Sequence, residues 1–240
     1  MKILSINGSP RGHSSNTNKM IIEILKGAEE KGAETEKILL SELDIKHCRG
    51  CFCCWMNKNN KCIINDDMEE LIEKYTKSDI VIYGTPLFMD NVSSILKVFI
   101  DRCIAIVCPY MEKDAKGEYR HIKSGSFKIP KFVVVSNAAF PENSQFQVVS
   151  HYFKRLARSM HTEVIAEIYR GQGLLLALPK HADDRYIIDS YKKLLYRAGK
   201  EIVENFVINE KTQIEIDKSL VSYDKYINSI EDYWQKVLGN

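Results

Sequence analysis

The sequence predicts a doubly wound α/β domain in which helices cover both faces of a five-stranded parallel sheet. Short apolar runs with the composition of strands alternate along the chain with longer runs of helical periodicity. Such alternation is typical of parallel strands joined by right-handed crossovers. A chain of 240 residues with 45% hydrophobic residues is long enough to bury one core of this kind, so we expect a single main domain.

Five segments have the length and composition of strands. The third of them, at 79–83, is a continuous apolar run, which is typical of a parallel strand buried on both faces. The first, third and fourth segments end abruptly in small or polar residues, as strands do where they enter loops. The five expected strands are residues 2–6, 35–40, 79–83, 132–135 and 164–168.

Stretches of helical periodicity connect these strands. The first helix is expected to run from Ser15 to the stop signal at Gly32. The pair Asp66-Asp67 is expected to supply an N-cap for the second helix. After the first helix, the expected helices are residues 68–78, 92–107, 143–160 and 183–206.

Several segments fall outside this alternation. Residues 113–125 are polar with two glycines and predict an exposed insertion, whereas residues 173–178 are expected to extend or bend the last strand. A cysteine-rich excursion at 47–65 interrupts the main domain, which is expected to span residues 1–207. The tail at 208–240 is too aromatic for plain disorder. We expect it to pack on the domain or on a partner subunit, or to cover the bound ligand.

The balance of charge limits the classes of partner. The chain has 34 Lys and Arg residues against 32 Asp and Glu residues and shows no long basic stripe. It therefore predicts neither nucleic-acid binding nor a polybasic membrane anchor. The start of the chain has the pattern of a strand rather than a signal peptide, and no apolar run approaches the roughly 20 residues that cross a bilayer. We expect a cytoplasmic protein whose partners are small molecules.

The loop after the first strand has the composition of an anion site. It offers hydroxyl, amide and guanidinium donors beside the first turn of a helix, whose dipole favours an anion. Its spacing matches neither the dinucleotide-binding motif nor the P-loop. The loop therefore predicts a site for a terminal phosphate monoester, although a simple strand-to-helix turn uses similar residues. The candidate donors are Ser9, Arg11, Ser15, Asn16 and Thr17.

This loop resembles the first loop of a known family, the NAD(P)H-dependent FMN reductases and flavin-binding quinone reductases of flavodoxin-like fold. The similar residues are Gly8-Ser9-Pro10-Arg11 and Ser15-Asn16-Thr17. The resemblance implies that these residues bind the phosphate of FMN. It also implies the flavodoxin-like strand order 2-1-3-4-5.

The resemblance continues after the third and fourth strands. Residues 84–88 look like the flavin loop of the family, and residues 96–102 look like its Lys-x-x-x-Asp-Arg helix. The likeness of residues 84–88 implies that this loop places a rigid backbone and apolar side chains against the isoalloxazine ring. Within residues 96–102, Lys97, Asp101 and Arg102 fit a surface ion pair and a structural anchor. The implied flavin contacts are Pro86, Leu87, Phe88, Met89 and Asn91, together with Ser136, Asn137 and Ala138 after the fourth strand.

Five of the seven cysteines lie within one short segment. The spacing Cys48-x2-Cys51-x2-Cys54-x7-Cys62 supplies four thiolates, enough for a tetrahedral zinc or a [4Fe-4S] cluster. The spacing resembles the compact motif of iron-sulfur flavoproteins, a branch of the same family, and this resemblance implies a cluster. Cys53 departs from that motif. Structural or residual thiols and zinc are the alternatives.

The resemblance implies an oxidoreductase that passes electrons from NADH or NADPH through FMN to an acceptor such as a quinone or a flavin. The sequence contains no recognisable hydrolytic constellation, so we expect the flavin rather than a catalytic side chain to carry the chemistry. The alternative hypothesis is an iron-sulfur flavoprotein that exchanges electrons with protein partners. A third hypothesis is a scaffold without flavin. We expect the protein to be a homodimer or a tetramer.

Overall fold

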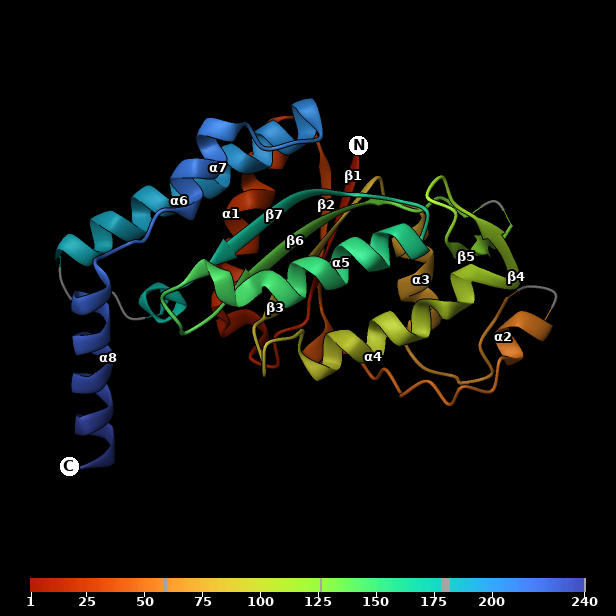
Figure 1. Ribbon diagram of the computed structural model, residues 1–240, viewed down its shortest axis with the longest axis horizontal. Helices are drawn as coiled ribbons and strands as arrows, with labels where there is room; N and C mark the ends of the chain where they lie inside the picture. Colours follow the sequence, from red (N-terminus) through yellow and green to blue (C-terminus); the bar gives the residue numbers. More distant parts are fainter. Residues whose placement is uncertain (58–59, 126, 178–181, 240) are drawn as a thin grey trace.

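The structure is a computed structural model that describes residues 1–57, 60–125, 127–177 and 182–239, and a five-stranded sheet lies at its centre (Figure 1). The strand order is β2-β1-β3-β6-β7, and neighbouring strands are parallel throughout. Because β4 and β5 form a separate hairpin, this is the predicted 2-1-3-4-5 order, and the doubly wound fold is confirmed. The strands are β1 (Lys2–Asn7), β2 (Glu34–Leu39), β3 (Ile80–Pro86), β6 (Lys131–Asn137) and β7 (Val164–Arg170).

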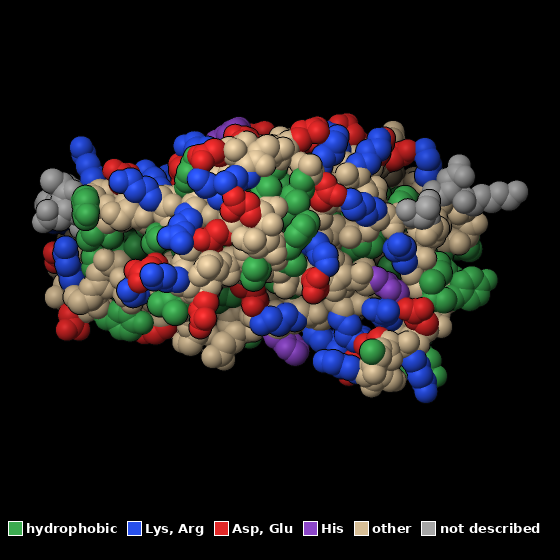
Figure 2. Space-filling view, turned by 90° about the horizontal axis from the view of Figure 1, so that it is seen from above, with side chains coloured by type: hydrophobic (Ala, Val, Ile, Leu, Met, Phe, Trp, Pro, Cys, Tyr) green, Lys and Arg blue, Asp and Glu red, His purple; other side chains and the backbone are tan. Residues whose placement is uncertain are grey.

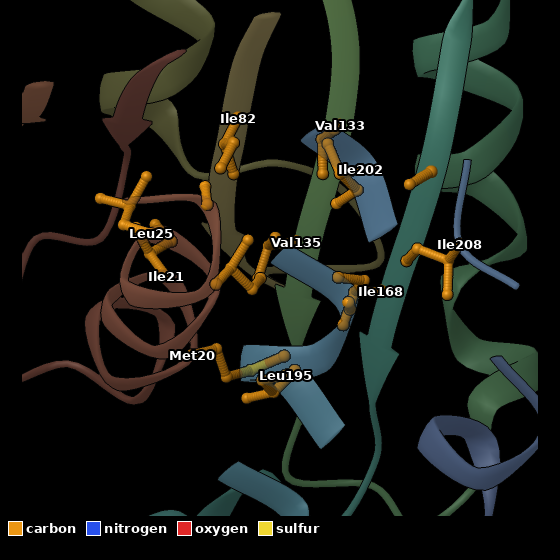
Figure 3. Packing of buried hydrophobic residues seen from close by; sticks show 14 of the residues in the cluster. Met20, Ile21, Leu25, Ile82, Val133, Val135, Ile168, Leu195, Ile202 and Ile208 are labelled. Atoms are coloured by element: carbon orange, nitrogen blue, oxygen red, sulfur yellow. The ribbon is translucent and has the colours of Figure 1, made fainter. Parts of the chain in front are cut away.

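Helices cover both faces of the sheet (Figure 1). One face carries α1 (Asn16–Glu30) and α6 (Ala182–Asn205), and the other carries α3 (Met68–Thr76), α4 (Ser94–Arg102) and α5 (Gln147–Ser159). Successive strand residues point to opposite faces, so Ile82 and Val135 pack under α1 and α6 while Val81 and Val134 pack under the other three helices. Figure 3 shows the first layer, in which side chains of α1 and α6 meet those of β3, β6 and β7.

Two glycines let α1 and α6 pack backbone to backbone. A β-carbon on Gly27 would lie 1.8 Å from the carbonyl oxygen of Tyr196, and one on Gly199 would lie 2.0 Å from that of Ile24. Neither position has room for a larger residue. This contact fixes α1 against α6, and the first turn of α1 is part of the candidate site described below.

The predicted helix at 92–107 is wrong in its second half. Helix α4 ends at Arg102, and the chain then enters an antiparallel hairpin. Pairing with β5 explains the difference: Val107 pairs with Lys123, and the N–H of Ser124 donates to the carbonyl of Ile106 (3.0 Å). Such tertiary contacts override local helical periodicity. The predicted insertion at 113–125 is the turn and second strand of this hairpin, and its residues are largely exposed, as predicted. The elements are η3 (Cys103–Ile106), β4 (Val107–Lys113) and β5 (Tyr119–Lys123).

Short helical turns modify the other expected elements. The predicted helix at 143–160 begins as a 3-10 turn before α5, and the chain bends into another 3-10 turn after β7, within the predicted stretch 173–178. The last residue of that stretch lies outside the described residues. The short elements are η1 (Gly12–Ser14), η2 (Leu40–Glu42), α2 (Cys53–Met56), η4 (Asn143–Phe146) and η5 (Gly173–Leu176).

The tail forms two helices, α7 (Glu210–Asp217) and α8 (Tyr223–Leu238). We call residues 208–239 the C-terminal extension. Helix α7 packs against α6 and β7, whereas α8 runs away from the body of the molecule (Figure 1).

Figure 2 shows that basic and acidic side chains are interspersed over the face that is seen from above. In the ranges that the structure describes, no helix has both the length and the apolar character needed to cross a bilayer.

Candidate functional site

A cavity of about 200 Å³ opens at the carboxyl ends of β1, β3 and β6. It lies where the strand order reverses between β1 and β3, the position at which open α/β sheets bind ligands. We call this cavity the cup. Its lining consists of Ser9, Arg11, Ser15, Asn16, Thr17, Pro86, Leu87, Phe88, Asn137, Ala138, Ala139, Gly173 and Leu174.

Ser15, the N-cap of α1, orders the first loop of the cup. Its hydroxyl accepts a hydrogen bond from the N–H of Asn18 (3.0 Å) and donates one to the carbonyl of Gly12 (2.8 Å). The protein itself therefore uses this hydroxyl, and its role in the cup is to fix the loop. The N–H groups of Asn16 and Thr17 have no intrahelical partner at this end of the helix. They open a helix whose dipole attracts an anion.

Two side chains of α1 connect the first loop to other parts of the cup. The Asn16 amide donates to the carbonyl of Gly173 (2.7 Å), and the Thr17 hydroxyl accepts from the amide of Asn137 (2.8 Å). The buried Oδ1 atom of Asn16 has no hydrogen-bond partner among the described residues. Since an unpaired buried acceptor is costly, a ligand that donates a hydrogen bond to this oxygen fits the cup.

Two positively charged side chains lie near the first loop of the cup. Arg11 lines it and is exposed, and Lys19 on α1 donates to the carbonyl of Leu176 (2.8 Å). Burial lowers the pKa of Lys19, and repulsion from Arg11 and Lys192 lowers it further. A bound anion would relieve that repulsion, so these cations favour a negatively charged ligand.

The loop after β3 forms an apolar wall of the cup. The N–H of Leu87 donates to the carbonyl of Asn137 (2.9 Å), which joins this loop to the end of β6. At the tip, Phe88 and Asn91 exchange two backbone hydrogen bonds of 3.0 Å. Met89 lies between them at positive φ and is 97% exposed. The backbone N–H groups of Leu87 and Phe88 are therefore used within the protein.

The structure brings most of the predicted flavin-contact residues into one lining. Met89 and Asn91 lie outside that lining, at the tip of the β3 loop. Ser136 is fully buried within β6, and its hydroxyl has no hydrogen-bond partner among the described residues. Ala139 and residues 173–174 also line the cup but were not among the predicted contacts. Gly173 closes the Gly-Gln-Gly turn after β7, and the glycines of this turn were an available loop signal.

The cysteine segment comprises residues 47–65, of which 58 and 59 lie outside the described residues. We call the place where its two ends meet, at Lys46 and Asp66, the neck, and a buried ion pair holds it. Arg102 contacts both carboxylate oxygens of Asp66 (2.6 and 3.0 Å) and donates to the carbonyl of Lys46 (2.7 Å). The side chains of the pair are 2% and 0% exposed. Burial acts to raise the pKa of Asp66, but hydrogen bonds from Arg102 and from the N–H groups of Lys46 and Met68 outweigh it and lower the pKa.

The neck agrees in part with the sequence analysis. Arg102 is a structural anchor, as predicted, and Lys97 pairs with Asp101 on the exposed surface of α4. The expected N-cap is confirmed in part. Asp67 is the N-cap residue of α3, but its carboxylate accepts from the N–H of Asp44 (2.7 Å), and Asp66 accepts from the N–H of Met68 in the first turn (3.2 Å). Asp66 and Asp67 thus connect the chain that enters the cysteine segment to the chain that leaves it.

Four cysteines line a second cavity of about 30 Å³, namely Cys48, Cys51, Cys54 and Cys62. Cys53 lies outside this lining. Cys48 and Cys51 are exposed, whereas Cys54 is buried. Within the described residues, no three His, Cys, Asp or Glu side chains are placed to hold a metal ion. The number of thiols suits a metal or a cluster, but their positions in the structure do not close around one.

The cysteine segment packs on its own chain. The indole N–H of Trp55 donates to the carbonyl of Ile104 (3.2 Å), and its ring lies 5.1 Å from that of His121 between centroids. The amide of Asn60 donates to the hydroxyl of Ser124. The segment is therefore held by the hairpin that follows α4.

Sequence comparison places the chain among flavin proteins. Residues 1–126 match the sequence model of a family described as NADPH-dependent FMN reductase. An iron-sulfur flavoprotein of Methanocaldococcus jannaschii is 38% identical over 102 residues, which are 42% of this chain and 51% of that protein. One of Archaeoglobus fulgidus is 38% identical over 120 residues, 50% of this chain and 51% of that protein. The chain spans about half the length of the curated relatives it matches.

Solved structures share the architecture. An FMN-dependent NADH-azoreductase from Bacillus anthracis, crystallised in complex with FMN, superposes with a TM-score of 0.59 and 15% identity. The superposition covers 85% of this chain and 99% of that chain. At this identity the likeness shows the fold alone.

We expect Asp66→Asn to destabilise the protein by about 3–5 kcal/mol, because it leaves the buried charge of Arg102 without its partner. Urea unfolding at neutral pH measures the change. The matched control is Asp101→Asn, which breaks an exposed ion pair and is expected to cost less than about 1 kcal/mol. An equal loss of unfolding free energy in the two variants would contradict the role given to the Asp66–Arg102 pair.

The same pair predicts acid sensitivity. Because the folded pKa of Asp66 lies below its ordinary value, the contribution of the carboxylate is complete above about pH 4 and is lost as the pH falls through the folded pKa. The difference in stability between the wild type and Asp66→Asn should therefore shrink below about pH 4.

Proposed function

Since this chain belongs to the NADPH-dependent FMN reductase family, we propose that the cup binds FMN and that the protein transfers electrons from NAD(P)H to a small acceptor. The observation that carries the proposal is the cup itself, in which hydrogen-bond donors and positive charge at the start of α1 adjoin an apolar wall. When bound, FMN supplies the hydride and one-electron chemistry that no side chain of the cup provides.

The first loop would hold the phosphate. The N–H groups of Asn16 and Thr17 open α1, and the guanidinium of Arg11 lies at the rim of the same cup. Together they offer main-chain donors, a helix dipole and a full positive charge to a dianion. The unpaired Oδ1 atom of Asn16 would accept a hydrogen bond from a hydroxyl of the ribityl chain.

The remaining lining would receive the ring. Pro86, Leu87 and Phe88 form one wall, and Ala138 and Leu174 belong to the loops at the end of β6 and after β7. A volume of about 200 Å³ is below the roughly 300–1,000 Å³ of pockets that enclose a whole ligand. Part of the ring would therefore stay accessible, so that a nicotinamide and a quinone or flavin acceptor can stack on it in turn.

We expect Arg11→Ala to weaken FMN binding about 5- to 30-fold, because the loss of one charge-assisted contact to phosphate removes about 1–2 kcal/mol. Quenching of flavin fluorescence during titration of the apoprotein measures the dissociation constant. Riboflavin, which lacks the phosphate, should bind the variant and the wild type equally.

The control variant is Lys26→Ala, which removes an exposed charge from the far end of the same helix. It should bind both flavins like the wild type. If Arg11→Ala weakened the binding of riboflavin as much as the binding of FMN, the phosphate would not lie at this loop.

The second candidate function is electron transfer between protein partners by an iron-sulfur flavoprotein. Two observations favour it: the four cysteines line one cavity, and the curated relatives at 38% identity are named iron-sulfur flavoproteins. A cluster would require the exposed thiols of Cys48 and Cys51 to turn toward Cys54 and Cys62.

One preparation separates the two functions. The protein is purified without oxygen, its iron and acid-labile sulfide are measured, and the flavin is then mixed rapidly with NADH or NADPH. Rapid bleaching of the flavin by either nucleotide is the expected result for a reductase. Bound iron and sulfide without bleaching would favour the carrier instead.

We further propose that two copies of the chain associate through α8. Its apolar residues recur at alternating steps of four and three, which is the seam spacing of a coiled coil. These residues are exposed or half-buried in the single chain, with Trp234 at 48% exposure. Because the same seam is present on each copy, it can pair with itself. The seam is formed by Tyr223, Ile227, Ile230, Trp234 and Val237.

The double variant Trp234→Glu, Val237→Glu should shift the protein to a monomer, since charges in the seam oppose its burial. Light scattering coupled to size-exclusion chromatography measures the mass. The control Gln235→Glu adds a charge beside the seam and should leave the mass unchanged. A monomeric wild-type protein would refute this assembly.

A further inference from the structure

The C-terminal extension holds the two loops that form the far wall of the cup, and we propose that it positions these loops and so sets how tightly the protein binds FMN. The inference rests on the proposed FMN site. It adds to that site a part of the chain beyond residues 1–126, the range that matches the family.

Gln172 anchors the linker between α7 and α8. Its side chain is fully buried, and its backbone lies at positive φ (56°). The amide oxygen accepts from the N–H groups of Leu220 (2.7 Å) and Val221 (3.3 Å), and the amide nitrogen donates to the carbonyl of Val221 (2.8 Å). The guanidinium of Arg170 also donates a hydrogen bond to the carbonyl of Lys218 (2.8 Å). The end of β7 therefore holds the extension through four hydrogen bonds.

The backbone next to Gln172 holds the wall of the cup. The N–H of Gln172 donates to the carbonyl of Phe140 (2.8 Å), and the N–H of Gly173 donates to that of Ala138 (2.7 Å). Ala138 and Gly173 both line the cup. The linker, the turn after β7 and the loop after β6 thus form one hydrogen-bonded unit.

Tyr226 joins the same two loops from outside the cup. It lies in the first turn of α8 and is 1% exposed. Its hydroxyl donates to the carbonyl of Ala139, and the backbone N–H of Leu174 lies near enough to the same oxygen to lower its pKa. Both of these residues line the cup. Burial raises the pKa of Tyr226 to about 12, so the hydroxyl keeps its proton and remains a donor at neutral pH.

This arrangement matters for binding because loops are the mobile parts of a fold. When a ligand must order mobile loops on binding, the conformational entropy that the loops lose weakens the affinity. Loops that are already held in place before binding avoid this loss. Tyr226 and Gln172 do not line the cup, so they act as positioning residues for Ala139, Gly173 and Leu174.

The test compares Tyr226→Phe with the wild type in the full chain. The variant keeps the buried ring and loses the hydroxyl. We expect the dissociation constant for FMN to rise about two- to tenfold. In the apoprotein, amide hydrogen exchange should become faster at residues 138–141 and 172–176. The visible circular dichroism of bound FMN should also change, because it reports the surroundings of the ring.

The control is Ser229→Ala, which removes an exposed hydroxyl from the same helix, outside the seam, and should change none of these three measurements. Unchanged FMN affinity and unchanged exchange in Tyr226→Phe would overturn the proposal. The outcome is separable from that of the proposed function. If the wild type fails to bind FMN, the FMN site is refuted, while exchange in the apoprotein still shows whether Tyr226 holds the loops.

Discussion

The candidate site depends on one residue, Asn137, where three distant segments meet. Its carbonyl accepts from the N–H of Leu87 (2.9 Å), and its side chain donates to the hydroxyl of Thr17 (2.8 Å). A parallel sheet brings the carboxyl ends of its strands to one edge, so a single residue at the end of β6 can reach the start of α1 with its side chain and the β3 loop with its carbonyl. The cup is thus held by backbone and amide contacts that do not depend on a ligand.

Most of the fold could be predicted because its signals are local. Apolar runs and the breaks after them identified the five strands, and their alternation with helices implied the parallel sheet. The hairpin after α4 was missed because residues 103–107 are all apolar and continue the helical pattern, whereas their conformation depends on pairing with β5. Helix α7 was missed because it gains its stability from packing on α6 and β7, which the sequence does not display. Helix α8 had an available signal, since Ser222 caps it and its apolar residues follow helical spacing.

The site could be predicted only as far as its residues have a sequence pattern. The loops after β1 and β3 were proposed as site residues from their sequence patterns and line one cup, but the use of the Ser15 hydroxyl as a helix cap follows from backbone geometry. The part played by Tyr226 depends on a contact across 87 residues, and no local signal distinguishes it from the other tyrosines of the tail. The cysteine spacing likewise predicts a set of metal-ligating thiols. Where these thiols lie in space depends on the Asp66–Arg102 pair and on the contacts of the segment with the hairpin.

Helix α4 connects the two sites mechanically. At its start, the hydroxyl of Ser93 caps the helix and donates to the carbonyl of Gly8, beside the phosphate loop. At its end, Arg102 closes the neck of the cysteine segment and lines the cysteine cavity. Nine residues of helix span about 13 Å, so the sites are separate but share one rigid element. A β-carbon on Gly8 would lie 2.6 Å from that of Leu96, so the loop after β1 packs directly against α4 with no room for a larger residue. The two ends of one short helix therefore take part in both sites.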